Sequence, residues 1–249
     1  MDLRNFILFL LMAPFLTLAA CNLDAPAQKT TTDSDQTTES DISTEASESM
    51  ADSAGGALYV LEEELDALES AGTGASLVAA SLAGSSRATV TIVPSWTSAT
   101  RTYYDASGAS IGSSYSSLAS SVTTTRNGSY TVTTSKTSGT VAIESTFTVS
   151  KLNDASSATW NITGKVKVIR DKTTVSGGRS LESLIVHDLI LSVDKASHRV
   201  TGGSASSTAE LTINQRNFQR TWSWEFSGNG TAVLTLSRGS TVTITVQAI

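Results

Sequence analysis

The sequence predicts an all-β domain of roughly ten to twelve antiparallel strands, preceded by one short amphipathic helix. From about residue 86 onwards, apolar and polar residues alternate at every second position, with Thr and Val prominent. Gly, Asn, Asp and Ser punctuate this alternation at turn positions. No helix-length pattern separates the alternating segments, so we expect antiparallel neighbours without parallel crossovers.

The helix is predicted within residues 54–72. Leu58, Leu61, Leu65 and Leu68 follow a spacing of three and four, and acidic residues fill the other faces up to Gly72. We expect one amphipathic helix that covers the sheet. A short coiled-coil segment for oligomerisation is the alternative, although two heptads are few for a coiled coil.

Residues 73–249 are predicted to form the antiparallel β domain. Turns are expected at the Asn127-Gly128 dipeptide and at residues 153–156, 228–230 and 238–239. Long strands joined consecutively favour a curled meander or partial barrel, and a β-sandwich stays open as the alternative. The rows expected to face the core are Ala88, Val90 and Ile92; Val141, Ile143, Phe147 and Val149; Trp160, Ile162, Val166 and Val168; Ile185, Leu189, Leu191 and Val193; Trp222, Trp224 and Phe226; and Val242, Ile244 and Val246.

The amino-terminal region has the pattern of a secretory signal. Residues 1–20 carry a weakly positive start, an apolar run that is too short to span a bilayer, and small residues before Cys21. The tetrapeptide Leu18-Ala19-Ala20-Cys21 resembles the lipobox of bacterial lipoprotein precursors. The resemblance implies cleavage between Ala20 and Cys21, a lipid anchor on the Cys21 thiol, and attachment to the membrane. Residue 22 is Asn rather than Asp, which by the enteric sorting rule favours the outer membrane over the inner membrane.

Residues 21–53 are predicted to form a lipidated, disordered tether. The segment after Cys21 is rich in Ser, Thr, Asp and Glu and has almost no bulky apolar side chains. Such a composition buries too little surface to offset the entropy of ordering. Because Cys21 is the only cysteine, its acylation would leave no thiol for disulfides, zinc or nucleophilic catalysis.

The net charge of −6 hides an asymmetry between the segments. The tether and helix are strongly acidic, whereas residues 70–249 hold fifteen Lys and Arg against nine Asp and Glu. The favoured interpretation is that these cations only keep the strands soluble and block edge pairing. The alternative is a modest affinity of the domain for an anionic envelope polymer or for lipid headgroups, and no nucleic-acid partner is expected. The basic residues behind the hypothesis are Lys165, Lys167, Arg170, Lys172, Arg216 and Arg220.

The motifs that could carry chemistry are weak, and we expect no catalytic residue, metal site or cofactor. Gly108-Ala109-Ser110-Ile111-Gly112 matches the nucleophile elbow, but no apolar strand precedes it and no helix follows. Ser192-Val193-Asp194-Lys195 matches S-x-x-K, but here it continues a strand. Glu144, Glu210 and Glu225 are expected to be solvated, so a carboxylate pair for glycoside hydrolysis is not indicated.

The histidines and tryptophans are expected to be structural. His187 shares the parity of Ile185 and Leu189, which predicts a hydrogen-bonded core histidine. A metal site of His187, Asp188, Asp194 and His198 is the alternative, but Asp188 points away from His187. Trp160, Trp222 and Trp224 are expected in the core. Trp96 is expected in a loop, where it is the best single candidate for an exposed contact, although core packing is favoured.

The sequence therefore predicts a non-enzymatic, membrane-anchored lipoprotein with an envelope binding or structural role, whose ligand is not indicated. One alternative is a carrier or receptor for amphiphiles, since a curled sheet with a covering helix is similar in fold to the outer-membrane receptor of lipoprotein trafficking. The other is a hydrolase of envelope glycan or ester that uses Ser110 or an unrecognised carboxylate pair. An apolar cavity under the helix would favour the carrier, and Ser110 beside a histidine would favour the hydrolase.

Overall fold

The structure is a computed structural model that describes residues 33–51, 55–72, 86–87, 90–133, 137–174, 179–228, 231–236 and 241–245. The predicted signal peptide, Ala20, Cys21 and the first part of the tether lie outside these residues, as do residues 238–239 of one predicted turn. Lipidation and cleavage at Cys21 therefore stay predictions.

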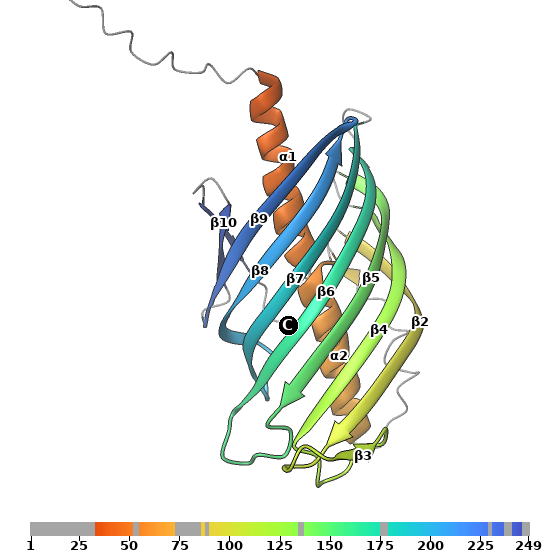
Figure 1. Cartoon of the computed structure of the whole chain (residues 1–249), viewed down its shortest axis with the longest axis vertical. Helices are drawn as coiled ribbons and strands as arrows, with labels where there is room; N and C mark the ends of the chain where they lie inside the picture. The colour runs from red at the N-terminus through yellow and green to blue at the C-terminus, as the bar shows by residue number, and fades with distance from the viewer. Residues whose placement is uncertain are drawn as a thin grey trace, which may run out of the picture.

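The described strands form one antiparallel sheet of eleven strands, which confirms the predicted fold class and strand number. Every strand pairs with its neighbours in sequence, except that the short β3 pairs β2 and lies off the main path. The order runs from β1 at one edge to β11 at the other, so the sheet curls without closing (Figure 1). Of the two predicted architectures, the curled meander is therefore correct and the sandwich is wrong.

The strands are β1 (Ser86–Arg87), β2 (Val90–Tyr104), β3 (Ser110–Gly112), β4 (Ser121–Thr133), β5 (Thr137–Ser150), β6 (Thr159–Thr174), β7 (Ser180–Asp194), β8 (Val200–Ile213), β9 (Arg216–Ser227), β10 (Thr231–Leu236) and β11 (Thr241–Thr245). Strands β5 and β6 are joined at residues 151–158, as the turn residues predicted. Strands β9 and β10 form the hairpin predicted at residues 228–230.

The predicted apolar rows on β5, β6, β7 and β9 lie on the inner face of the sheet. The side chains of the other two predicted rows lie outside the described part of the structure, at Ala88, Val90 and Ile92 and at Val242, Ile244 and Val246. Burial alternates along β7, where Ile185, His187, Leu189 and Leu191 are buried and the residues that alternate with them are more exposed. The same parity buries Ile162 on β6 and Trp224 on β9. Hydrophobic burial of one face per strand thus positions a continuous core along the concave side.

The turn predicted at Asn127-Gly128 is wrong, because both residues lie within β4 and pair with Glu144 and Ile143 of β5. Gly128 lets the Trp96 side chain approach the β4 backbone closely, and it does not form a turn. A Cβ added at Gly128 would lie 2.4 Å from the Cε3 atom of Trp96. Trp96 lies in β2, half-buried against the core, so its predicted position in a loop is also wrong.

Two helices lie end to end along the inner face, where the sheet curls around them (Figure 1). They are α1 (Asp33–Met50) and α2 (Ala57–Gly72). The four leucines of α2 are buried, as their spacing predicted. Helix α1 corrects the prediction of a disordered tether for residues 33–50. It buries one apolar residue on each turn, at Ile42, Ala46 and Met50, and its acids meet cations of the sheet.

Candidate functional site

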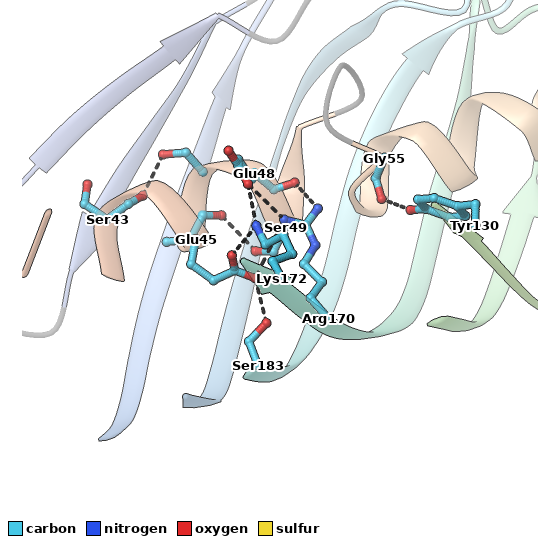
Figure 2. Close-up of polar contacts among 11 residues, drawn as sticks. Ser43, Glu45, Glu48, Ser49, Gly55, Tyr130, Arg170, Lys172 and Ser183 are labelled. Carbon is cyan, nitrogen blue, oxygen red and sulfur yellow. Dashed lines mark hydrogen bonds and ion pairs between the residues drawn. The ribbon is translucent and has the colours of Figure 1, made fainter. Parts of the chain in front are cut away.

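The inner face of the sheet carries buried cations that are paired with acids of the two helices. Arg170 and Lys172 lie on β6 and point toward α1, with side chains 1% and 2% exposed (Figure 2). They continue the parity of Val166 and Val168, so the twist of β6 carries them beneath the helix. The inner face is therefore apolar at its centre and positively charged under α1.

Two glutamates of α1 neutralise this pair. The Nζ atom of Lys172 lies 2.6 Å from the Oε2 atom of Glu45 and also contacts the carboxylate of Glu48. Arg170 donates to the Glu48 carbonyl oxygen at 2.6 Å, and its Nη1 lies 3.7 Å from the Glu45 carboxylate. The hydroxyl of Ser183 on β7 donates to Glu45 at 2.6 Å. In Figure 2 these side chains converge between β6, β7 and α1.

Further ion pairs extend this contact along α1. Arg179, which precedes β7, lies 2.9 Å from Asp41, and Arg220 of β9 lies 3.3 Å from Glu39. We call Arg170, Lys172, Arg179 and Arg220 the cation strip. Each of its members faces a carboxylate of α1.

A second buried cluster holds α2. Glu64 accepts from the Nη2 atom of Arg101 on β2 at 2.7 Å and lies 3.2 Å from Arg126 on β4. Burial raises the pKa of Glu64, and the two arginines oppose that rise. Burial also lowers the pKa of Arg126, whose guanidinium lies 4.7 Å from the ring centroid of Trp96. The cluster joins α2 to β2 and β4, which are separated from β6 in the sheet by β5.

His187 is a buried, hydrogen-bonded core residue, as its parity predicted. Its Nδ1 atom lies 2.7 Å from the Ser207 hydroxyl, which also accepts from Trp224 Nε1 at 3.1 Å. The hydroxyl has two lone pairs and one proton, so the direction of its hydrogen bond with Nδ1 depends on the tautomer of the ring. Burial and the charge of Arg170 lower the pKa of His187 to about 3. The neutral imidazole therefore has a structural role in the core.

His198 lies in the β7–β8 connection beneath the end of α2. It is 3.3 Å from Asp66 and 3.7 Å from Glu69, and its ring is 5.4 Å from that of Trp160, which is half-buried. The hydrogen bond to Asp66 raises the pKa of His198. The metal set proposed with His187, Asp188 and Asp194 is not assembled, since no group of three or more such side chains among the described residues could hold a metal ion.

The catalytic-looking motifs lie on exposed turns or strands. Residues 108–112 belong to the β2–β3 hairpin, where Asp105 accepts from the backbone of Ser107 and Ala109, and Ser110 is exposed. Lys195 donates to the Asp154 carbonyl oxygen at 2.8 Å. The three glutamates considered for glycoside hydrolysis are exposed, as expected.

The surface cations considered for anion binding divide into two groups. Lys165 and Lys167 face outward and pair with Asp188 and Glu144, at 3.3 Å and 3.1 Å. Arg216 is exposed at the start of β9. Arg170 and Lys172 are instead buried beneath α1, and Arg220 also contacts that helix. The charged cluster on the inner face was therefore missed, although the parity that Arg170 and Lys172 share with Val168 could have revealed it.

No protein-family model, curated protein or solved structure matches this chain. None of the described helices is both long and apolar enough to cross a membrane. The candidate site is therefore defined by the geometry of this chain alone. The inner face of the curled sheet contacts two acidic helices, and buried ion pairs join them to it.

Proposed function

We propose that this protein is a lipid-anchored bacterial envelope lipoprotein whose β domain is a non-catalytic binding or structural module. The anchor is supported by the Leu18-Ala19-Ala20-Cys21 sequence. The role of the domain is supported by one observation above all. The buried ionisable clusters around Glu45 and Glu64 join helices to the sheet, so these groups stabilise an arrangement of elements.

The amphiphile carrier is less well supported. Hollows of about 540 Å³ lie mainly over outward-facing side chains of β6–β9, such as Leu184, Glu210 and Gln219. The inner face, where a curled sheet would enclose an acyl chain, is covered by α1 and α2. A carrier would therefore have to move both helices before it could load a ligand.

Within the part of the chain that the structure describes, no assembled set of residues supports the hydrolase. Ser110 is exposed on β3, whereas His187 contacts Ser207 in the core and His198 contacts acids of α2. A serine nucleophile needs a base within hydrogen-bond reach. Both described histidines already have other partners.

Metabolic labelling with palmitate in an enteric host tests the anchor. We expect the wild-type protein to be labelled and to sediment with outer membranes, and Cys21→Ala to be unlabelled and released from them. The matched variant Asn22→Asp should stay labelled but move to the inner membrane. An unlabelled wild-type protein that is freely secreted would overturn the proposal.

Mass spectrometry of the protein purified from its native envelope tests the role of the domain. We expect a protein or envelope polymer to co-purify with the wild type. A stoichiometric lipid that fills the inner face would instead favour the carrier.

A further inference from the structure

Helix α1 has a composition that disfavours a helix in isolation. Of its eighteen residues, five are Ser, three Thr and three Asp, which are weak helix formers in the helix interior. Its last turn has no basic residue, and Glu45 and Glu48 lie near the end where the helix dipole disfavours carboxylates. An isolated segment of this length and composition would be largely unfolded. Contact with the sheet must therefore supply most of the stability of α1.

The sheet contributes mainly electrostatic complementarity. Only Ile42, Ala46 and Met50 bury apolar surface from α1, whereas four described acids each meet a member of the cation strip. The pairs of Arg179 and Arg220 are partly exposed, so salt weakens them, whereas the buried pairs of Arg170 and Lys172 are screened much less. The contact between α1 and the sheet thus resembles a binding interface more than a core.

The requirement for an acidic occupant comes from the sheet. Arg170 and Lys172 are 1% and 2% exposed beneath α1, and each meets carboxylates of that helix. Buried charges without a partner are strongly unfavourable. Any segment that replaces α1 must therefore supply carboxylates near the positions of Glu45 and Glu48.

We propose that the cation strip is an exchangeable binding site for an acidic helical segment of a partner protein, and that α1 is its intramolecular occupant. The partner segment folds on docking and presents small or apolar residues four apart with acids between them, as Ile42, Ala46 and Met50 do in α1. This inference rests on the proposed binding role of the β domain but not on the lipid anchor. It names the class of partner, an acidic helical segment, and it places the binding site at the cation strip.

A fluorescent peptide with the sequence of residues 33–50 is the probe for this site. The protein is the full chain in which the four paired acids of α1 are neutralised, Glu39→Gln, Asp41→Asn, Glu45→Gln and Glu48→Gln. The matched control neutralises four exposed acids on the outer face, Glu144→Gln, Glu182→Gln, Glu210→Gln and Glu225→Gln. Both variants change the net charge by the same amount.

Fluorescence anisotropy should show the peptide binding to the α1 variant at least about tenfold more tightly than to the control or the wild type. Adding Lys172→Met should abolish binding, and a scrambled peptide of the same composition should not bind. Binding should weaken as salt rises. Equal binding to all variants, equal binding of the scrambled peptide, or no binding to an α1 variant whose β domain stays folded after α1 is released would overturn the proposal.

Hydrogen exchange on the wild-type protein tests exchangeability even if the α1 variant does not fold. The amides of α1 should exchange at least about tenfold faster than those of β6 and β7, and salt should accelerate them selectively. Protection of α1 equal to that of β6 at every salt concentration would show that α1 is a fixed core element. Palmitate labelling would be unaffected by either result, so failure here is distinguishable from failure of the proposed anchor.

Discussion

His187 should make the stability of the protein sensitive to mild acid. The ring is fully buried beside the Ser207 hydroxyl, and burial together with the Arg170 charge keeps it neutral. Its other described neighbours, the Arg170 charge and the backbone of Ser49 at the end of α1, also shape its titration. His187→Gln removes the titrating group while keeping an amide that can hydrogen-bond to Ser207.

The magnitude follows from the difference between the folded and unfolded states. The pKa of His187 is lowered to about 3 in the folded protein, whereas an unfolded histidine titrates near 6.5. Below about pH 6.5 the unfolded chain binds a proton that the folded chain does not, so stability falls as pH falls, by about 1.4 kcal/mol per pH unit. Between about pH 7 and pH 5, His187 alone should reduce the free energy of unfolding by about 2 kcal/mol.

Urea unfolding followed by tryptophan fluorescence at several pH values measures this effect. The His187→Gln variant should lose about 2 kcal/mol less than the wild type on acidification, whatever its stability at neutral pH. His198→Gln is the control of opposite sign. Because the pKa of His198 is raised, its contribution is present below about pH 6.5 and is lost as pH rises through the folded value. Parallel pH profiles for the wild type and His187→Gln would refute the reasoning.

Two further predictions concern backbone geometry and buried charge. Gly203 has a φ of +125°, and a Cβ there would lie 2.2 Å from a carbonyl oxygen of the neighbouring strand, so Gly203→Ala should cost about 3 kcal/mol or more in thermal unfolding. Gly108→Ala, at φ +84° with open space around it, should cost only about 1 kcal/mol, and equal costs would contradict the steric argument. Glu64→Gln should destabilise by about 3–5 kcal/mol because it removes the buried carboxylate that both Arg101 and Arg126 contact. Glu144→Gln, in an exposed pair, should cost less than about 1 kcal/mol in the same urea titration; similar losses would show that burial does not set the strength of these pairs.

The strands were predictable because burial on one face imposes a period of two. Rows such as that of Ile185 and Leu189 predicted which residues face inward. Turn residues predicted where β5 connects to β6 and where β9 connects to β10. The Asn127-Gly128 dipeptide led to a wrong turn prediction, because a glycine can either form a turn or leave room for a neighbouring side chain. Here the ring of Trp96, which is distant in sequence, decides between them.

The charged inner face could be predicted only in part. The sequence showed an acidic amino-terminal segment and a basic β domain, but composition alone indicated disorder for residues 33–50. The order of α1 depends on Arg170, Lys172 and Arg220, whose positions require the assembled sheet. Local sequence therefore predicted the sheet, while tertiary ion pairs determined the helix that it holds.

The meander has a consequence for how the protein folds. Apart from β3, each strand pairs with its neighbours in sequence, so the sheet can grow by successive local hairpins with little loop-closure entropy. Helix α1 is different, because its contacts with Arg170 and Arg220 join residues 122 and 181 positions apart. Its docking cannot be completed until β9 has joined the sheet. We therefore expect fast assembly of the strands and a later step in which the amino-terminal segment is captured.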